Sequence, residues 1–313
     1  MSKKFRVFID GSAGTTGLRI AERLAQRSDI ELLSIAEEDR KDVQKRADVI
    51  NSADLAFLCL PDDAAREVVP LVHEDVKLLD TSTAHRTNPA WTYGFPELKG
   101  QRDKIKNACR VAVPGCHASG FIALAAPLVQ GGLIPADYPF TCHSLTGYSG
   151  GGKKMIGQYE EEGRPDGYDS PRPYALSLHH KHLPEMQAVC GLTKPPVFCP
   201  IVADYYSGME TMIPLHMDGI SSTPEQIHSF LKDYYAGQAL IRVHDLNEVP
   251  ADGTIASNTC GSTDHMEIFV TASPDGQQMM LISLFNNLGK GASGAAIQCM
   301  NILLGVNETE GLE

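Results

Sequence analysis

The feature that most constrains the fold of this 313-residue chain is a glycine-rich turn near its start. Residues 5–10 are an apolar run typical of a buried parallel strand. The turn at residues 11–17 follows at once, and residues 18–24 repeat apolar side chains at helical spacing. A strand, a glycine-rich turn and a helix in this order are the context in which proteins bind the pyrophosphate of a dinucleotide. We therefore predict a nucleotide-binding α/β domain at the start of the chain.

Each glycine of this turn has a separate expected role. Gly11 permits the tight turn, Gly14 lets the backbone approach a pyrophosphate, and Gly17 lets the helix pack on the strand. The GxxGxxG spacing departs from the commoner GxGxxG, and glycine turns also end strands in proteins that bind no cofactor. The predicted cofactor contacts in the turn are Gly11, Ser12, Gly14, Thr15, Thr16 and Gly17.

The charged residues after the second strand leave the choice of cofactor open. The group that contacts the ribose is expected about 20 residues after the turn. Glu37 and Glu38 would suit a free 2′-hydroxyl, whereas Arg40 and Lys41 would suit a 2′-phosphate. Charge alone therefore does not decide between NADH and NADPH.

The alternation of strands and helices predicts two domains. Apolar runs at residues 30–36, 54–60 and 76–80 alternate with helical stretches, which is typical of a doubly wound parallel (Rossmann) sheet. We expect residues 1–115 to form this dinucleotide-binding domain, completed by a C-terminal helix within residues 291–313.

Residues 116–290 are predicted to form a second, catalytic domain of the α+β class with a mixed sheet. Strand-like runs at residues 267–272 and 278–285 flank the turn SPDG, which is typical of a hairpin. The glycine-rich segment 146–154 is predicted to be a polar loop.

Composition argues against several classes of function. A formal net charge of −12 disfavours nucleic acid or an anionic membrane as the main partner. No run of about 18 apolar residues suggests a membrane span, and the first residues lack the apolar region of a signal peptide. Eight cysteines without a CxxC pair are typical of reduced thiols and not of a disulfide framework or a zinc ribbon. We therefore expect a cytoplasmic protein.

Cys116 is predicted to lie where a strand turns into a helix. The apolar run 111–113 is stopped by a Pro-Gly pair, and residues 121–126 are typical of a buried helix. The positive end of a helix dipole favours a thiolate, which makes Cys116 a candidate nucleophile. Most free cysteines are small buried hydrophobes, and this stretch alone does not separate the two interpretations.

A histidine cluster at residues 179–185 supplies candidate acid and base groups. A cysteine beside a nicotinamide can hold an acyl group as a thioester during its reduction, and one imidazole can then act as both base and acid. His180, His182 and Glu185 could instead bind a metal, but without CxxC or HExxH motifs we expect no metal. A structural role is the simpler interpretation of the remaining candidates, His85, His117, His143 and His179.

Five motifs occur in an order that resembles one enzyme family. They are residues 11–17 (GSAGTTG), 113–116 (VPGC), 147–153 (GYSGGGK), 180–185 (HKHLPE) and 287–294 (NLGKGASG). Together they resemble the shorter form of the N-acetyl-gamma-glutamyl-phosphate reductases of arginine biosynthesis, over nearly the whole chain. Aspartate-semialdehyde dehydrogenase shares the architecture and is the nearest enzymatic alternative.

The resemblance implies a reaction and a set of catalytic residues. NADPH would reduce N-acetyl-gamma-glutamyl phosphate to N-acetylglutamate semialdehyde, with release of phosphate, through a thioester on Cys116. His180 would be the acid and base of the reaction, supported by His182 and Glu185.

The same resemblance implies binding residues. Arg86 would hold the substrate phosphate or carboxylate, although a surface ion pair explains it equally well. Ser149 and Gly150 would line the substrate pocket. The family's use of NADPH favours Arg40 and Lys41 as the residues that contact the ribose. Further cofactor contacts are expected from Asn287, Lys290 and Gly291.

Alternatives remain open for the acid–base residue and for the function. His117 follows the cysteine where relatives often carry an aromatic residue, so it is a second imidazole beside the candidate nucleophile. A non-enzymatic dinucleotide sensor would have no use for a reactive thiol, and a cysteine hydrolase would need no cofactor. The apolar strands of the second domain suggest a subunit interface, hence a homodimer or homotetramer.

Overall fold

The computed structural model describes residues 4–312, which divide into two compact units. Residues 4–115 and 292–312 make up the first unit, and residues 116–291 make up the second. No helix within residues 4–312 combines the length and the apolar character that a membrane span requires.

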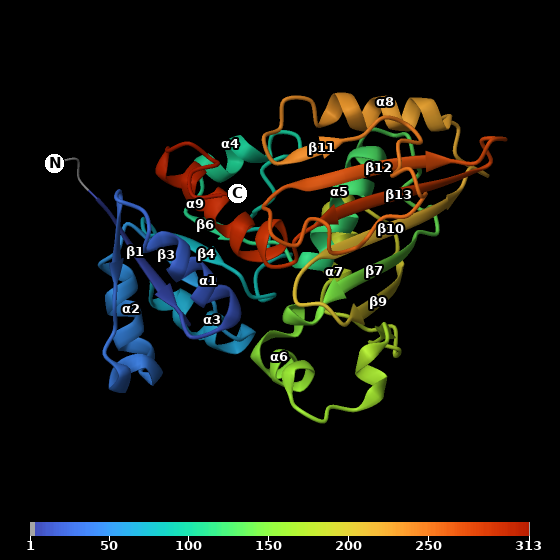
Figure 1. The fold of residues 1–313 in the computed structure, drawn as a ribbon. Helices are drawn as coiled ribbons and strands as arrows, with labels where there is room; N and C mark the ends of the chain where they lie inside the picture. The colour runs from blue at the N-terminus through green and yellow to red at the C-terminus, as the bar shows by residue number, and fades with distance from the viewer. Residues whose placement is uncertain (1–3, 313) are drawn as a thin grey trace. The chain divides into compact units, whose positions relative to one another are not determined.

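The first unit is built on a six-stranded sheet in which every strand pair is parallel (Figure 1). The strands are β1 (Phe5–Asp10), β2 (Ile30–Leu33), β3 (Leu55–Leu58), β4 (Lys77–Asp80), β5 (Thr92–Tyr93) and β6 (Arg110–Ala112). Their order is β2-β1-β3-β4-β6-β5. The predicted parallel sheet is therefore confirmed. Its topological switch point lies between β1 and β3, where open α/β sheets bind nucleotides beyond the carboxyl ends of the strands.

Helices and short 3-10 turns connect these strands. They are α1 (Thr15–Leu24), η1 (Glu37–Lys41), α2 (Val43–Asn51), α3 (Asp62–Val68), η2 (Val69–Leu71), α4 (Gln101–Lys106) and α9 (Gly294–Leu304). Asp42 caps α2, because its carboxylate accepts hydrogen bonds from two backbone N–H groups of the first turn at 2.9 and 3.1 Å. α3 ends at Val68 because Pro70 has no N–H with which to continue the helical hydrogen bonds.

Both faces of this sheet are covered, because successive strand residues point to opposite sides. Val7 and Ile9 pack with α1 and α9 on one face, whereas Phe8 packs with α2 and α3 on the other. Ile297 and Met300 of α9 are fully buried there. The C-terminal helix is therefore a component of the first unit's core.

The second unit is built on a seven-stranded mixed sheet, as predicted for an α+β domain. Its strands are β7 (Thr141–Gly147), β8 (Arg172–Pro173), β9 (Val197–Ala203), β10 (Met209–His216), β11 (Ile241–Val243), β12 (Met266–Ala272) and β13 (Gln278–Phe285). Their order is β11-β12-β13-β10-β7-β9-β8. The β11–β12 and β7–β9 pairs are parallel and the others antiparallel. The predicted hairpin is the β12–β13 pair, whose turn contains Gly276 at φ 68°.

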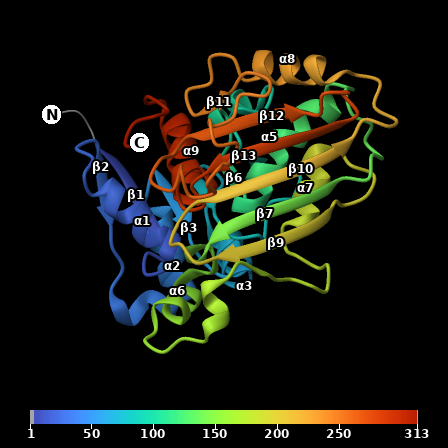
Figure 2. The same ribbon diagram turned by 45° about the vertical axis from the view of Figure 1, so that its right-hand side comes forward.

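Helix α5 (Cys116–Gln130) is the central helix of the second unit. It packs on β10 and β13 and contacts α7 (Leu183–Cys190) and α8 (Pro224–Tyr234). Figures 1 and 2 show α5 and α7 behind the same face of the sheet. At Gly120, a Cβ atom would lie 2.3 Å from Oγ1 of Thr211 on β10, so only glycine allows this approach. The helix is thereby anchored close to its first residue, Cys116.

The segment predicted to be a polar loop, residues 146–154, is largely helical. It forms the 3-10 turn η3 (Tyr148–Gly151) and the start of α6 (Gly152–Glu160). The Tyr148 ring stacks on that of Tyr159, with ring centroids 4.7 Å apart. The loop prediction was wrong because these tertiary contacts stabilise helical structure despite the low helix propensity of glycine.

Candidate active site

Cys116 is the first residue of α5, as the strand-to-helix pattern predicts. β6 ends at Ala112, and a Pro-Gly pair turns the chain directly into the helix. The side chain is half-buried, and the helix dipole supplies positive potential at this end. Burial raises the pKa of the Cys59 thiol to about 12 and that of the Cys260 thiol to about 11, so both stay protonated at neutral pH. Cys116, as the first residue of a helix, is better placed than these two thiols to act as a thiolate nucleophile.

The imidazole of His180 is half-buried and lies in the turn before α7. Its Nδ1 accepts a hydrogen bond from the backbone N–H of His182 at 3.2 Å. The neutral ring consequently carries its hydrogen on Nε2, to which no hydrogen bond occurs within residues 4–312. Burial and the nearby charge of Lys181 lower the pKa of His180 to about 4. At neutral pH this residue offers an N–H donor, which suits the protonation of a developing oxyanion.

Unlike His180, His117 has hydrogen-bond partners at both ring nitrogens. Its side chain is buried, with Nδ1 2.7 Å from the Ser144 hydroxyl and Nε2 2.7 Å from the Tyr174 hydroxyl. Burial, reinforced by the charges of His180 and Lys181, lowers the pKa of His117 to about 3. Because both ring nitrogens are already bonded, the structure favours His180 over His117 as the acid–base residue.

His182 and Glu185 are buried at the start of α7, and His182 contacts His180. The ring centroids of His180 and His182 are 4.7 Å apart with the planes nearly perpendicular. This position is compatible with the predicted supporting role. His179, by contrast, is exposed and approaches the backbone oxygen of Ser177 at 3.0 Å. Within residues 4–312, the histidine, cysteine and acidic residues form no group of three that could hold a metal ion.

The C-terminal motif contributes to the surroundings of Cys116 through its backbone. A Cβ atom at Gly291 would lie 3.0 Å from Cβ of Cys116, so this glycine lets the π-helical turn η5 (Gly289–Ser293) pass close to the cysteine. π-Helical turns occur frequently at functional sites. Lys290, in the same turn, is buried. The structure therefore brings two of the predicted cofactor contacts into the unit that contains Cys116.

Ser149 and Asn287 contact each other in the interior of the second unit. The Asn287 amide donates to the Ser149 hydroxyl at 3.0 Å and accepts from the backbone N–H of Gly208 at 2.9 Å. Both side chains are buried. Gly150, the third of these predicted binding residues, is exposed. The ligand roles of all three stay predictions, and the observed bonds give Ser149 and Asn287 a structural role.

Arg86 connects the ends of two strands in the first unit. Its Nε donates to the backbone oxygen of Val113 at 2.9 Å, and one terminal nitrogen donates to that of Thr81 at 3.0 Å. The guanidinium thus holds the chain just beyond β6, three residues before Cys116 in the sequence. The predicted contact with substrate stays a prediction.

The glycine-rich turn of the first unit has the shape of a phosphate cradle. Gly11 has φ +88°, and a Cβ atom there would lie 2.3 Å from the backbone oxygen of Cys59. At Gly17, a Cβ atom would lie 2.5 Å from the oxygen of Gly11. Gly14, the N-cap of α1, provides no side-chain hydrogen bond to the first turn that contains Thr15 and Thr16. The first N–H groups of α1 can therefore bind a phosphate.

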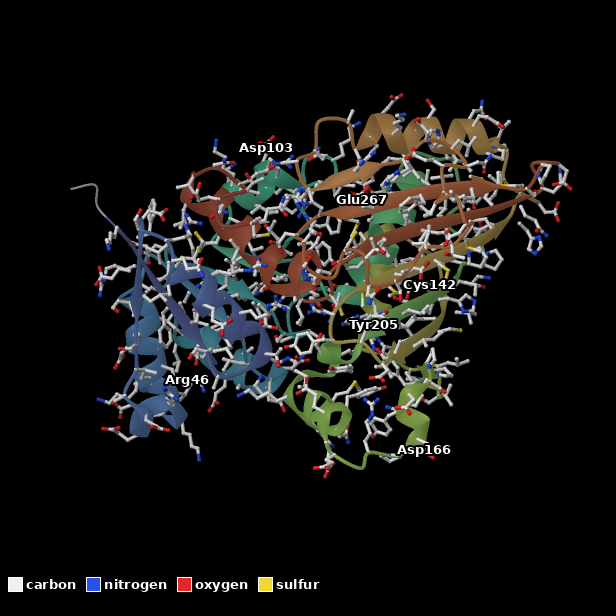
Figure 3. All side chains as sticks on the ribbon, in the orientation of Figure 1. Arg46, Asp103, Cys142, Asp166, Tyr205 and Glu267 are labelled. Carbon is white, nitrogen blue, oxygen red and sulfur yellow. The ribbon has the colours of Figure 1, made fainter. Side chains whose placement is uncertain are left out.

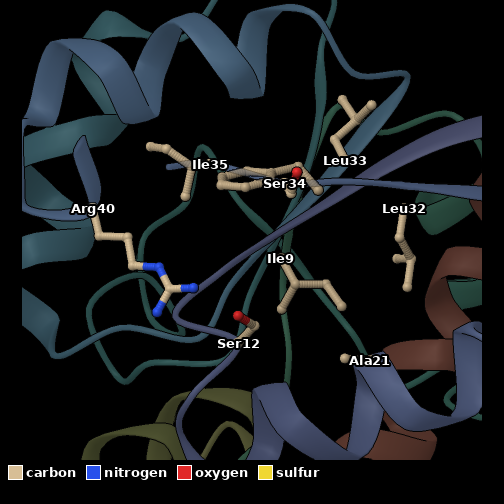
Figure 4. Close-up of a pocket in the computed structure, with 9 residues that line it drawn as sticks. Ile9, Ser12, Ala21, Leu32, Leu33, Ser34, Ile35 and Arg40 are labelled. Atoms are coloured by element: carbon tan, nitrogen blue, oxygen red, sulfur yellow. The ribbon is translucent and has the colours of Figure 1, made fainter. Parts of the chain in front are cut away.

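A cavity of about 170 Å³ adjoins this turn (Figure 4). Its lining residues are Phe8, Ile9, Ser12, Ala21, Leu32, Leu33, Ser34, Ile35 and Arg40. Figure 4 shows the Arg40 guanidinium turned toward Ser12. An apolar cavity with two hydroxyls and one guanidinium fits an adenosine that carries a 2′-phosphate, so these residues fit NADPH. Lys41, Glu37 and Glu38 are not among the lining residues, and Ser34 is one that the sequence analysis missed.

A second cation beside this sheet is already neutralised. Arg46 of α2, labelled in Figure 3, donates from Nε to the Asp10 carboxylate at 3.0 Å, and both side chains are buried. Burial raises the pKa of Asp10, and the charge of Arg46 opposes that rise. Arg40 is therefore the better candidate for the phosphate.

Family models match both units. The model described as "Semialdehyde dehydrogenase, NAD binding domain" matches residues 6–108, and "Semialdehyde dehydrogenase, dimerisation domain" matches residues 116–287. Among solved structures, an aspartate semialdehyde dehydrogenase II from Vibrio cholerae aligns with a TM-score of 0.69 at 16% identity, covering 97% of this chain and 99% of that one. An aspartate semialdehyde dehydrogenase with NADP from Candida albicans aligns with a TM-score of 0.66 at 14% identity, covering 96% and 99%. The fold and the site thus define an oxidoreductase of the semialdehyde dehydrogenase class.

Closer relatives narrow this class to one family. The N-acetyl-gamma-glutamyl-phosphate reductase of Brucella anthropi is 46% identical over 308 residues, which cover 96% of this chain and 99% of the relative. That of Trichormus variabilis is 46% identical over 320 residues, which cover 99% of each. The chain belongs to the N-acetyl-gamma-glutamyl-phosphate reductase family. The family predicted from the five sequence motifs is therefore confirmed.

Proposed function

We propose that this protein uses NADPH to reduce N-acetyl-gamma-glutamyl phosphate to N-acetylglutamate semialdehyde, with release of phosphate, in arginine biosynthesis. The observation that carries the proposal is the placement of Cys116 at the start of the buried helix α5, next in the chain to His117, whose ring packs with that of His180. Family membership supports the choice of substrate. The closest alternative is an aspartyl phosphate, which the same chemistry would accept.

Cys116 performs the covalent step. Its thiolate attacks the acyl carbon, the carbon–oxygen bond to phosphate breaks, and a thioester remains on the sulfur. The first N–H groups of α5 favour the thiolate before this attack. When NADPH is bound, it supplies the two electrons that reduce the thioester, and the semialdehyde leaves as the thiolate re-forms.

His180 controls the proton during these steps. Its Nε2–H donates to the negative charge that develops on the acyl oxygen. Acting as a base toward the Cys116 thiol would require Nε2 to lose its hydrogen, and the bond from the His182 backbone to Nδ1 opposes that tautomer. The bond from the His182 backbone therefore supports a role for His180 as the proton donor, and we assign His182 and Glu185 as its supports.

The pyrophosphate and the 2′-phosphate of the cofactor would bind to the first unit. Gly11 and Gly17 allow the tight turn, the first N–H groups of α1 after Gly14 would bind the pyrophosphate, and Ser12 with Arg40 would hold the 2′-phosphate. The remaining predicted contacts, at Thr15, Thr16, Lys41, Asn287, Lys290 and Gly291, belong to the same proposal. The first unit would then be the dinucleotide-binding domain, and residues 116–291 the catalytic domain.

The proposal also covers the oligomeric state of the protein and its location in the cell. One face of the sheet in the second unit carries the partly buried side chains of Met212 and Met280 and the buried Ile282. An apolar sheet face of this kind suits a contact between subunits, so we propose a homodimer or homotetramer. The protein would act in the cytoplasm on a small anionic acyl phosphate, without nucleic acid or membrane as partner.

An activity screen in the oxidative direction tests the substrate. The protein is incubated with a panel of semialdehydes, phosphate, and NADP or NAD, and formation of the reduced nucleotide is followed by its absorbance. We expect turnover with N-acetylglutamate semialdehyde and NADP. Turnover with aspartate semialdehyde alone would contradict the substrate assignment.

The variant Cys116→Ser tests whether the thiol is the nucleophile of the covalent step. It should abolish turnover while NADPH still binds, because the hydroxyl is a far weaker nucleophile. Full activity of this variant would remove the cysteine from the mechanism.

A further inference from the structure

A chain of buried hydrogen bonds begins at the residue next to Cys116. Nδ1 of His117 lies 2.7 Å from the Ser144 hydroxyl, and Nε2 lies 2.7 Å from the Tyr174 hydroxyl. The Ser144 hydroxyl is in turn 2.9 Å from Oγ1 of Thr211. Ser144 and Thr211 are fully buried and face each other across the β7–β10 pair. The chain therefore links the candidate active site to the interior of the sheet.

The surrounding packing holds this chain in place. The close approach of α5 to β10 at Gly120 leaves no space for Thr211 to move toward the helix. On the other side, the backbone N–H of Tyr174 donates to the oxygen of Pro200 on β9 at 3.0 Å. Both ends of this series of hydrogen bonds, Thr211 and Tyr174, are consequently attached to the sheet. His117 lies between them and holds the Tyr174 hydroxyl in position.

The chain of hydrogen bonds can run in two directions through a neutral His117, and the direction in which Nε2 donates is the one that leaves the phenolic hydrogen available. One nitrogen of a neutral imidazole donates and the other accepts. When the Ser144 hydroxyl accepts from Thr211 and donates to Nδ1, the hydrogen on Nε2 is donated to the Tyr174 oxygen. The phenolic hydrogen is then available to donate outside the chain. Each bond of such a chain strengthens the next, because donation polarises the donor.

The Tyr174 hydroxyl is bonded to His117, the residue that directly follows the reacting thiol at the start of α5. The centroids of the His117, Tyr174 and His180 rings are 6.1, 6.0 and 5.7 Å apart in pairs, which places the three rings around the start of α5. Burial raises the pKa of the Tyr174 hydroxyl, and the negative charge of Cys116 raises it further. The phenol therefore keeps its hydrogen when the nearby thiol ionises.

We propose that the Tyr174 hydroxyl is a catalytic group that donates a hydrogen bond to the Cys116 thiolate, and that His117 is a positioning residue that holds this hydroxyl. No covalent bond changes in this contact, because the phenol retains its hydrogen throughout. The bond stabilises the thiolate relative to the thiol and so increases the fraction of reactive nucleophile. The inference rests on the proposed function for the identity of the nucleophile.

A double-mutant cycle tests the inference. Tyr174→Phe removes one oxygen, and His117→Phe removes both ring nitrogens but keeps an aromatic ring of similar volume. A hydrogen bond to a charged group is lost in each, so we expect both variants to lower kcat and the alkylation rate of Cys116 by about tenfold or more. Because His117 acts through Tyr174, the double variant should be no slower than either single variant. Alkylation by iodoacetamide at pH 7 is assigned to Cys116 by peptide mass.

Rescue and control variants separate positioning from folding. In His117→Gln the side-chain amide can still donate to the phenol, so this variant should recover most of the lost rate. Tyr138→Phe is the matched control, because its hydroxyl also makes two hydrogen bonds, both to the backbone of His216. This control variant should have the same kcat and the same Cys116 alkylation rate as the unchanged protein.

Three results would overturn the inference. They are an unchanged alkylation rate in Tyr174→Phe, additive losses in the double variant, and a His117→Gln variant as slow as His117→Phe. Should His117→Phe fail to fold, Tyr174→Phe alone decides, since it deletes only one hydroxyl. If the unchanged protein does not turn over the acyl phosphate, the proposed function fails, while the alkylation rates still test the contact between Tyr174 and Cys116.

Discussion

Two neighbouring residues at the start of α5 have different surroundings. Cys116 is half-buried at the first position, whereas His117 is buried with hydrogen bonds at both nitrogens. Successive helical residues point about 100° apart, so one can face a site while the next faces the core. This difference explains why His117 is a positioning residue in our proposal and His180 a donor.

The buried imidazole predicts how stability depends on pH. The pKa of His117 falls to about 3 in the folded protein, from about 6.5 in an unfolded chain. Between these values only the unfolded chain binds the proton, so the free energy of unfolding decreases as the pH is lowered, by about 1.4 kcal/mol per pH unit. His117→Gln should lose this component of the slope. Urea unfolding at pH 7, 6 and 5 measures it, and equal slopes in both proteins would contradict the prediction.

Arg40 and Lys41 are adjacent cations, but only Arg40 lines the cavity. We expect Arg40→Ala to weaken NADPH binding by about tenfold or more and to leave NADH binding nearly unchanged, because only NADPH carries the 2′-phosphate. Lys41→Ala removes the same charge and serves as the matched control. Fluorescence titration with both nucleotides gives the dissociation constants, and equal losses for NADPH and NADH in Arg40→Ala would exclude a phosphate contact.

At the scale of elements, local signals predicted some segments and failed at others. The β1–turn–α1 segment is specified by consecutive residues, and its Gly11 is required by both φ and space. Residues 146–154 carry a loop-like composition, yet they are largely helical because Tyr148 stacks on Tyr159. The helical structure of residues 146–154 depends on this ring contact, which the composition of the segment does not reveal.

Gly11 provides a test of the phosphate cradle. Gly11→Ala forces a Cβ atom against the Cys59 oxygen and should weaken NADPH binding more than tenfold, because the turn must shift. Gly100→Ala is the control, since Gly100 also has a positive φ, +73°, but open space around it. Its cost should be about 1–2 kcal/mol of stability, with unchanged binding. Circular dichroism establishes that both variants fold, and binding by Gly11→Ala equal to that of the control would refute the prediction.

At the scale of the whole molecule, the chain combines a parallel and a mixed sheet in two compact units. The sheet of the first unit is covered on both faces, whereas the sheet of the second carries α5 and α7 on one face. The other face bears a cluster of apolar side chains that includes Phe269 and Ile282. A face of this kind is where we expect a second copy of the chain to bind.

The predicted assembly is measurable. Light scattering after size exclusion should give the mass of a homodimer or homotetramer for the unchanged protein. Met280→Glu places a charge on the apolar face and should shift the mass toward the monomer, because an unpaired charge is costly to bury. Leu71→Glu, at an exposed apolar residue of the first unit, is the control. An unchanged mass in Met280→Glu would exclude this face as the interface.

The sequence by itself determined the parallel sheet, the mixed sheet, the position of Cys116 at a helix start and the family. Strands, glycine turns and hairpins are local patterns, and motifs in a fixed order identify a family regardless of geometry. Only the tertiary structure distinguished Arg40 from Lys41, gave Ser149 and Asn287 their mutual bond, and revealed the hydrogen bond between Tyr174 and His117. These contacts join residues far apart in the chain, or depend on which way a side chain points, and no local pattern encodes either.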